Sequence, residues 1–192
     1  MALVETRTFK KKIGINIVFN NQKVIGIMGS GQQAWAEFSI PLARWIAEQN
    51  YHLLTGGGEG VMAAASQAFC QVENRTGLCI GIIPTKLNEE GKFVPYQGYP
   101  NSWVELNIVS PLPRFDGWEI DRPTRNQICV LSSDIVVALP GSKGTKNEVD
   151  LAILFDKPII LFGEKKEFKD FPLLVERTSS IDRVRDFILA RS

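Results

Sequence analysis

The residues best suited to bind or transform a ligand lie in one stretch, ALPGSKGTKNEVDLAILFDKPIILFG at 138–163. An apolar run ends there in a Pro-Gly pair, and the loop Gly141–Thr145 leads into a helical pattern. Glycine lets the backbone approach a ligand closely, and the N–H groups that begin a helix attract anions. Glu148, three residues later, would repel an anion unless it acts on something attached to that anion. The stretch therefore predicts a phosphate-like ligand with a carboxylate beside it.

Two more glycine clusters follow apolar runs in the same manner. Their members are Gly29, Ser30 and Gly31 after the first run, and Gly56, Gly57 and Gly58 after the second. Neither cluster fits the G-x-G-x-x-G fingerprint of dinucleotide sites, and GSKGT is not a Walker A loop. One cluster alone would be weak support for a ligand site, because glycine also ends strands for steric reasons. Three clusters in equivalent positions favour a shared anion site.

The side chains around the third cluster leave two interpretations open. Lys143 and Lys146 could contact an anion, or they could face solvent as surface lysines usually do. Thr145 and Glu148 fit a T-x-x-E capping box at a helix start, which would give Glu148 a structural role. Arg125 lies in the preceding helical pattern, from which it could reach a phosphate or pair with Glu148.

Short, nearly continuous apolar runs alternate with helical patterns along the chain. The predicted strands are 23–29, 51–58, 78–84, 103–109, 134–141 and 157–163. The predicted helices are 32–50, 59–72, 122–133, 144–155 and 181–191. This alternation is typical of a parallel sheet covered on both faces. The predicted fold class is α/β, a Rossmann-like doubly wound, mostly parallel sheet with helices on both faces, in which the three glycine clusters meet at one edge.

Several features depart from this alternation. Residues 1–22 are predicted as an N-terminal arm or edge strand of a single domain that spans 1–192. Pro41 is expected to kink or break the helix in which it lies. Residues 84–102 and 110–121, rich in proline, glycine and aromatic residues, are predicted as irregular lids or contact surfaces. The aromatic residues that could form an oligomer contact there are Trp103, Phe115 and Trp118.

Composition argues against several classes of function. Lys and Arg number 22 against 21 Asp and Glu, so the net charge of +1 provides no broad basic surface for nucleic acid. No apolar run approaches the ~20 residues of a membrane helix, and no signal-peptide core is present, which predicts a cytoplasmic protein. His52, the single histidine, makes a histidine-based metal site unexpected. Cys70, Cys79 and Cys129 are interpreted as small buried residues in a reduced compartment.

The order of these motifs resembles the Lonely Guy family, formerly labelled lysine decarboxylase-like. TGGGEGVMAAASQAF, GIIP, an arginine-bearing helix and SDIVVALPGSKGTKNEVDLAILFDKPIILF carry the resemblance over residues 23–163. It implies a homo-oligomeric Rossmann fold, and many members are phosphoribohydrolases that cut the N-glycosidic bond of nucleoside 5′-monophosphates. Their P-G-G-x-G-T-x-x-E motif would place the phosphate loop at Gly141–Thr145 and the catalytic glutamate at Glu148, with Arg125 assisting it.

Two departures from the hydrolase pattern favour another branch of the same fold. The second motif glycine is Ser142, and the Arg-Lys dipeptide is replaced by Arg125-Asn126. The run IGIMGSG, TGGGEGVM, PTRN and LPGSKGTKNE is more similar to the molybdenum cofactor carrier proteins of algae and bacteria. That resemblance implies a carrier that binds, stores and protects the cofactor through its molybdopterin phosphate and molybdenum oxo group. Glu148 would then cap a helix or hold Arg125.

Three functions thus stand as alternatives: this carrier, a nucleoside 5′-monophosphate phosphoribohydrolase of the cytokinin-activating type, and a regulatory nucleotide-sensing module. The resemblance also implies a homo-oligomer, dimer or tetramer, that transfers cofactor to molybdoenzymes. The composition predicts no nucleic-acid or membrane partner and no metal held by side chains. The residues expected to bind the ligand are Gly29, Ser30, Gly31, Gly56, Gly57, Gly58, Arg125, Asn126, Gly141, Ser142, Lys143, Gly144, Thr145 and Glu148. Arg125 and Glu148 would be catalytic in the hydrolase alone.

Overall fold

The structure is a computed structural model that describes residues 22–114 and 123–191 of the chain. The arm or edge strand predicted over 1–22 lies outside the described residues, apart from Gln22. Phe115 and Trp118, two of the three aromatic residues expected at an oligomer contact, lie outside them as well.

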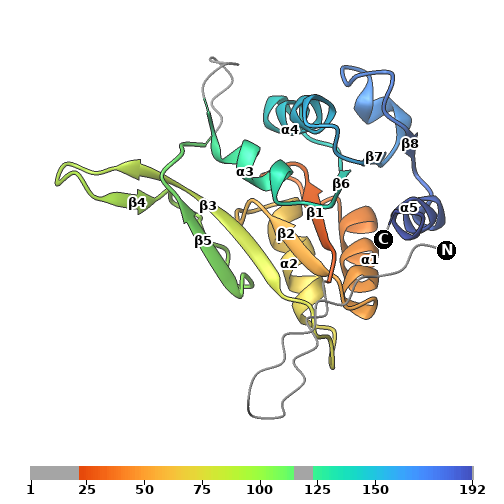
Figure 1. The fold of residues 1–192 in the computed structure, drawn as a ribbon, viewed down its shortest axis with the longest axis horizontal. Helices are drawn as coiled ribbons and strands as arrows, with labels where there is room; N and C mark the ends of the chain where they lie inside the picture. Colours follow the sequence, from red (N-terminus) through yellow and green to blue (C-terminus); the bar gives the residue numbers. More distant parts are fainter. Residues whose placement is uncertain (1–21, 115–122, 192) are drawn as a thin grey trace, which may run out of the picture.

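The described residues form one sheet of eight strands (Figure 1). The strands are β1 (Val24–Met28), β2 (His52–Thr55), β3 (Cys79–Leu87), β4 (Phe93–Pro95), β5 (Leu106–Ser110), β6 (Ile135–Ala138), β7 (Ile159–Phe162) and β8 (Arg177–Thr178). Their order is β4-β3-β2-β1-β6-β7-β8, and β5 pairs with β3. Only the β3–β4 pair within this sheet is antiparallel, so the predicted mostly parallel sheet is confirmed.

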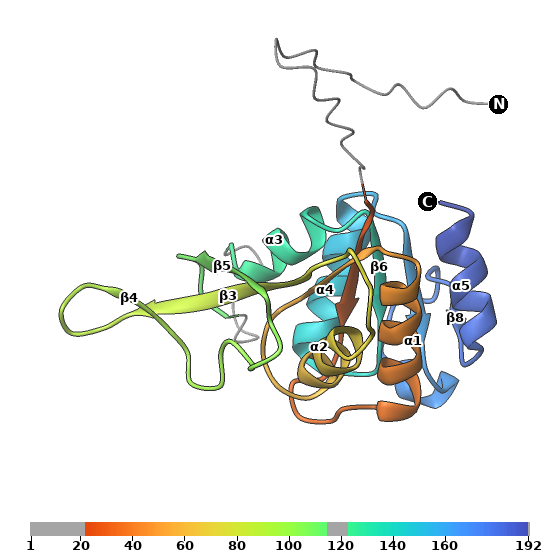
Figure 2. The same cartoon turned by 90° about the horizontal axis from the view of Figure 1, so that it is seen from below.

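Helices cover both faces of this sheet (Figure 2). They are α1 (Ala36–Glu48), α2 (Val61–Cys70), α3 (Arg125–Leu131), α4 (Lys143–Leu154) and α5 (Ile181–Leu189). Successive residues of a strand face opposite sides, so Val137 of β6 packs with α1, α2 and α5, while Val136 and Ala138 pack with α3 and α4. This doubly wound arrangement is the predicted fold class. Within the described residues, no helix has the length and apolar character needed to cross a membrane.

The strand order reverses between β1 and β6. β2 and β3 follow on one side of β1, whereas β6 and β7 lie on its other side. Met28, the last residue of β1, is paired with Ala138, the last residue of β6, so the two strands end at the same level. Ligands of open α/β sheets bind beyond the carboxyl ends of the strands at such a reversal. The loops after β1 and β6 are therefore the first place to look for a site.

The segment 84–102 was expected to be irregular, and this expectation is wrong for its first half. β3 continues to Leu87, turns, and pairs with β4 to form a hairpin that projects from the body of the molecule (Figure 1). The side chain of Asn88 accepts hydrogen bonds from the N–H groups of Glu90 and Lys92 in the turn, and Gly91 adopts a positive φ of 72°. Asparagine and glycine are standard turn formers, but a short strand with no buried face leaves little hydrophobic pattern.

Four of the five helices are shorter than predicted, and α4 has the predicted length but begins one residue earlier. α1 begins at Ala36 rather than at residue 32, and Pro41 lies inside it without ending it. Phe38 and Leu42 on either side of the proline are buried, so packing on the sheet holds the helix although the proline lacks one donor. The short 3₁₀ helix η1 (Lys165–Phe168) and the strand β8 were not predicted from the sequence.

Candidate ligand-binding site

A cleft of about 730 Å³ lies where β1 and β6 end, at the reversal of strand order. Small-molecule sites usually measure roughly 300–1,000 Å³, so the cleft has room for much more than a phosphate group. The expected binding residues that line it are Gly29, Ser30, Gly31, Gly56, Arg125, Asn126, Gly141, Ser142, Gly144, Thr145 and Glu148. Gly57, Gly58 and Lys143 are not among its lining residues. The three glycine clusters thus meet at one edge, as predicted, although the second contributes a single residue to the cleft.

Ser30 ties the loops of the cleft together. Its Oγ accepts hydrogen bonds from the N–H groups of Gln32 at 3.1 Å and Gln33 at 3.0 Å. Its N–H donates to the carbonyl of Pro140 at 3.2 Å, and its carbonyl accepts from the N–H of Val61 at 2.9 Å. A hydroxyl has one donor and two acceptor sites, so both acceptor sites are used here. The hydroxyl proton therefore remains as the donor that Ser30 can offer to an anion.

The N-terminus of α4 lies within the predicted phosphate loop Gly141–Thr145, because the helix begins at Lys143. Ser142 is the N-cap residue, and its side chain forms no capping hydrogen bond. The first backbone N–H groups of a helix have no partner inside the helix, and they carry a partial positive charge. A Cβ at Gly141 would overlap Thr145 Oγ1 and lie 3.0 Å from the nitrogen of Ser30, so this position is limited to glycine.

The capping box predicted from Thr145 and Glu148 is wrong. The N-cap of α4 is Ser142, three residues earlier than the Thr145 that the motif requires, so Thr145 and Glu148 both lie inside the helix. Both side chains are buried, and Glu148 points instead to Arg125. Glu148 therefore does not cap α4; its structural contact is with Arg125 of α3.

Arg125 and Glu148 form a buried ion pair at the wall of the cleft. The residues are 5% and 6% exposed, and Arg125 Nη1 lies 3.8 Å from Glu148 Oε1, too far for a hydrogen bond. Arg125 Nη1 donates to Cys129 Sγ at 3.2 Å, while its Nε is buried and has no hydrogen-bond partner among the described residues. Gly56 lies so close to the guanidinium that a Cβ there would overlap it. The Nε–H group of Arg125 therefore remains available to a ligand, and close packing against Gly56 fixes the position of the guanidinium.

The surroundings of Glu148 raise the pKa of its carboxyl group to near 7. Burial raises the pKa of Glu148 from its ordinary value of 4.5 to about 7, and the opposing effect of Arg125 is smaller. A carboxyl group with such a pKa exists in both protonation states at neutral pH. It can accept or release a proton, and in its protonated form it does not repel an anion.

The charged side chains that line the cleft do not make it positive overall. Arg114 and Arg125 stand against Glu59, Glu148 and Glu167. Affinity for an anion must therefore come from the backbone N–H groups of the α4 N-terminus, from Arg125, and from protonation of Glu148. Lys146 pairs with Asp150 at 2.8 Å, consistent with a solvent-facing role. Asn126 of α3 lines the cleft and donates from Nδ2 to Asn147 Oδ1 at 2.9 Å, which joins α3 to α4.

Sequence reasoning missed one wall of the cleft. Gln97, Gly98 and Tyr99 follow β4, and Arg114 follows β5, within the two segments that were expected to be lids or contact surfaces. Arg114 also lies over the ring of Tyr96, 5.7 Å from its centroid. The aromatic and basic residues of these two segments suggested contact with a ligand, but the sequence pattern does not show which segment reaches the cleft. Other lining residues that were not expected are Gln32, Gln33, Trp35, Glu59, Met62 and Glu167.

A family model described as the SLOG cluster4 family matches residues 22–187 of this chain. The solved structure of a molybdenum cofactor binding protein from the phototrophic bacterium Rippkaea orientalis is similar, with 31% identity and a TM-score of 0.69. The similarity covers 90% of this chain and 98% of that one.

Two further proteins are similar to this chain at lower identity. The molybdenum cofactor carrier protein from Chlamydomonas reinhardtii is 26% identical, with a TM-score of 0.63, over 88% of this chain and 99% of that one. An uncharacterized protein of Archaeoglobus fulgidus is 26% identical over 131 residues, which are 67% of this chain and 72% of that protein. The fold of this chain is therefore similar to that of molybdenum cofactor carrier proteins.

Proposed function

Because the chain belongs to the SLOG cluster4 family, and because two structurally similar proteins bind or carry molybdenum cofactor, we propose that it is a carrier that binds, stores and protects this cofactor. The cofactor would be cargo, held in the cleft and then transferred to molybdoenzymes. Binding, rather than turnover, is the activity that the cleft supports best.

The observation that carries the proposal is the placement of Arg125 beside an uncapped helix N-terminus. The buried Nε of Arg125 lacks a partner among the described residues, and the first N–H groups of α4 lack a side-chain cap. Both are suited to the terminal phosphate of molybdopterin or to the oxo group of the metal. Tyr99 and Arg114 also line the cleft, and its volume of about 730 Å³ leaves room for the rest of the molecule.

The proposal is tested by retention of the cofactor. Purified protein is mixed with isolated molybdenum cofactor under anaerobic conditions and passed over a desalting column, and the pterin is then oxidised and measured by its fluorescence. We expect pterin to elute with the protein, and to be displaced weakly or not at all by AMP, GMP or inorganic phosphate. Lys92→Ala, at the exposed tip of the β3–β4 hairpin, is a control that should retain the pterin equally. A protein fraction without pterin would contradict the proposal.

Replacement of Gly144 with alanine is expected to separate ligand binding from folding. A Cβ at Gly144 meets no atom within 4 Å, and alanine is favoured over glycine inside a helix by about 1 kcal/mol. The melting temperature should therefore stay unchanged or rise slightly. Gly144 lines the cleft, so the added methyl group should lower cofactor retention severalfold if the anion lies against this turn. Full retention of pterin by Gly144→Ala would place the anion elsewhere in the cleft.

The hydrolase alternative is favoured by one observation, the pKa of Glu148 near 7 beside Arg125. A carboxyl group with this pKa suits the acid and base steps of glycosidic bond cleavage. Incubation with AMP, followed by chromatography for free adenine, tests it. On the carrier proposal we expect no adenine above the buffer blank. Adenine release by the wild-type protein that disappears in Glu148→Ala would replace the carrier proposal with the hydrolase.

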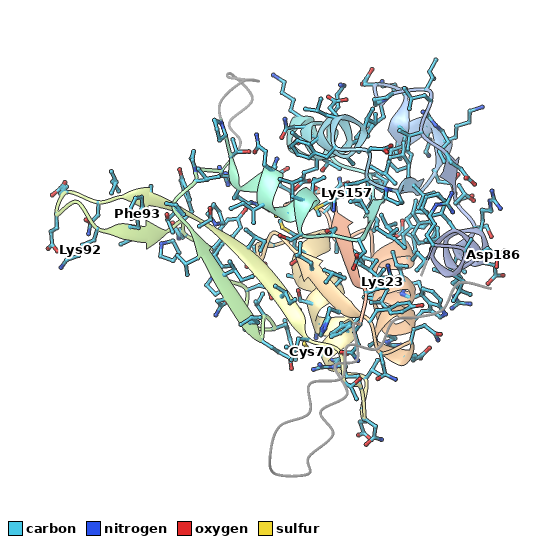
Figure 3. The ribbon with its side chains drawn as sticks, viewed as in Figure 1. Lys23, Cys70, Lys92, Phe93, Lys157 and Asp186 are labelled. Atoms are coloured by element: carbon cyan, nitrogen blue, oxygen red, sulfur yellow. The ribbon has the colours of Figure 1, made fainter. Side chains whose placement is uncertain are left out.

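We also propose that the carrier is a homo-oligomer, and that a second copy covers the β3–β4–β5 region. β5 pairs only with β3 among the described residues, so its outer edge carries unpaired backbone groups. Figure 3 shows Phe93 on the projecting hairpin. The exposed apolar residues of this region are Leu87, Phe93, Leu106, Ile108 and Val109. Trp103, expected at an oligomer contact, is half-buried near the start of β5.

Light scattering coupled to size exclusion tests this surface. We expect a dimer or tetramer for the wild-type protein and a smaller species for Val109→Lys, because a charge placed in an apolar interface opposes association. Val109 is 57% exposed, and the matched control is Leu173→Lys, which changes a residue that is 86% exposed on another part of the molecule. A wild-type monomer at micromolar concentrations, or an oligomer that survives Val109→Lys unchanged, would count against the proposed surface.

A further inference from the structure

Tyr99 lines the cleft, and its ring packs against the second glycine cluster. A Cβ added at Gly58 would lie 2.8 Å from Cε1 and Cζ of Tyr99 and 2.9 Å from its hydroxyl oxygen. Carbon atoms in contact prefer a separation of about 3.5–4.0 Å, so the ring can take this position only beside a glycine. Gly58 is not among the lining residues of the cleft. Its part in the site is therefore indirect, through the aromatic side chain that packs on it.

Asn101 fastens the loop that carries Tyr99 to the same glycine turn. Its N–H donates to the carbonyl of Gly57 at 2.7 Å, and its Nδ2 donates to the carbonyl of Gly58 at 2.9 Å. Its Oδ1 accepts from the N–H of Trp103 at 3.1 Å, and the residue is only 7% exposed. A buried amide whose donor and acceptor are both used holds the backbone around it in one arrangement.

The far end of this loop is held by Cys70, the last residue of α2. The thiol of Cys70 donates to the carbonyl of Trp103 at 3.1 Å. The sequence predicted a buried Cys70, and this is wrong, because the residue is only partly buried. The contacts of Cys70 and Asn101 are made within the protein, so the wall that carries Tyr99 is preformed, as is usual for small-molecule sites.

Tyr99 and Arg125 pack on one glycine turn and line one cleft. Gly56 lies against the guanidinium of Arg125, and Gly58 lies against the phenol of Tyr99. Two residues of chain span at most about 7 Å, so the charged group and the ring are within reach of a single small ligand. A guanidinium suits a phosphate or another oxyanion, and an aromatic ring in a cleft wall suits a flat ring system. The pair is suited to a phosphate ester that carries a planar heterocycle.

From this geometry we infer that Tyr99 recognises the planar heterocycle of the ligand, and that it selects phosphate esters that carry such a ring over those that do not. The inference rests on the proposed function, in which the heterocycle is the pterin of molybdenum cofactor. Gly58 and Asn101 are positioning residues, which act on the ligand only through Tyr99. The second glycine cluster, of which only Gly56 lines the cleft, thereby contributes to recognition of both ends of the ligand.

Equilibrium dialysis of the full chain with three probes tests this assignment. Molybdenum cofactor carries a pterin and a phosphate, GMP carries a purine and a phosphate, and ribose 5-phosphate carries the phosphate without a flat ring. We expect Tyr99→Ala to bind the cofactor about tenfold more weakly than the wild-type protein, and Tyr99→Phe to keep most of the affinity, because stacking needs the ring and not the hydroxyl. Ribose 5-phosphate should bind all three proteins equally. The control Phe93→Ala removes a ring that is 55% exposed on the β3–β4 hairpin, outside the cleft, and should change none of these affinities.

Gly58→Ala tests the positioning role. Its methyl group should displace the ring of Tyr99, so this variant should also bind the cofactor about tenfold more weakly and leave ribose 5-phosphate unaffected. Added to Tyr99→Ala, it should cause no further loss, because two changes that act through one side chain are not additive. A second loss of the same size in the double variant would show that Gly58 acts independently of Tyr99 and would contradict the positioning role.

The probes separate this inference from the proposed function. Equal affinity of Tyr99→Ala and the wild-type protein for the cofactor would overturn the role of Tyr99 and leave the carrier function in place. Binding of GMP but not of the cofactor, with a tenfold loss in Tyr99→Ala, would support the role of Tyr99 and reject the carrier function. An equal loss of affinity for ribose 5-phosphate in Tyr99→Ala would overturn ring recognition, and a failure of all three probes to bind the wild-type protein would overturn both proposals.

Discussion

Arg125→Met is expected to lower the affinity for molybdenum cofactor by about 100-fold, because it removes one charged partner from a buried pair at the ligand. It should also lower the free energy of unfolding by about 3–5 kcal/mol at about pH 9, above the pKa of Glu148 near 7, because a charged Glu148 is then left buried without its cation. Methionine fills much of the space of the arginine side chain, so the loss reports the charge rather than a cavity. Equilibrium dialysis measures the first effect, and urea denaturation measures the second.

The double variant Arg125→Met with Glu148→Gln separates the two effects. It removes both charges of the pair, so the unfolding free energy should recover by several kcal/mol, since an uncharged pair in the interior is often as stable as an ion pair. Cofactor affinity should stay low, because the guanidinium that contacts the anion is still absent. Recovery of tight binding in the double variant would show that Arg125 acts only by holding Glu148, and the anion would then have to be placed against α4 alone.

Wild-type affinity for the cofactor is expected to fall about tenfold relative to Glu148→Gln between about pH 6 and pH 8. The pKa of Glu148 is about 7, so the carboxyl group is mostly protonated at the lower pH and mostly charged at the higher. A charged Glu148 repels the anion, whereas a protonated one does not. The phosphate of the ligand also changes charge in this range, and the ratio of wild-type to variant affinity cancels that contribution. A ratio that does not vary with pH would contradict a position for the anion beside Glu148.

The same titration should appear in the stability of the free protein. The folded state keeps the Glu148 proton up to about pH 7, while the unfolded state releases it near the ordinary pKa of 4.5. Stability contributed by this group is therefore present below the lower value and is lost as pH rises through the higher one. Between these limits the wild-type protein should lose on the order of 3 kcal/mol relative to Glu148→Gln. Thermal or urea denaturation at several pH values measures the difference, and parallel curves for the two proteins would exclude the shifted pKa.

The sheet and the glycine loops could be predicted because their signals are local. Apolar runs end at Met28, Thr55 and Ala138, where β1, β2 and β6 end. Glycines follow each run, as expected where a strand ends in a tight turn. A parallel sheet places those ends at one edge, so the meeting of Ser30 with Gly141 followed from the fold class. Hydrophobic periodicity also located the five helices. Their predicted boundaries differ from the observed ones, because a helix end depends on capping residues that periodicity does not detect.

Errors arose where contacts distant in sequence decide the outcome. Thr145 and Glu148 have the spacing of a capping box, yet the helix begins earlier and Glu148 turns to Arg125 of another helix. The β3–β4 hairpin and the approach of Tyr99 to the cleft depend on how a loop folds back over the sheet.

Local patterns in the sequence were enough to predict the class of fold, the edge of the sheet that carries the site, and Arg125 and Glu148 as its candidate reactive residues. Those features follow from apolar periodicity and from glycine at strand ends, which are properties of neighbouring residues. The burial of these two side chains against each other, and the resulting pKa of Glu148 near 7, could be seen only in the folded chain. A pKa depends on how completely water is excluded, and that exclusion is produced by α3, α4 and the loop at Gly56 together.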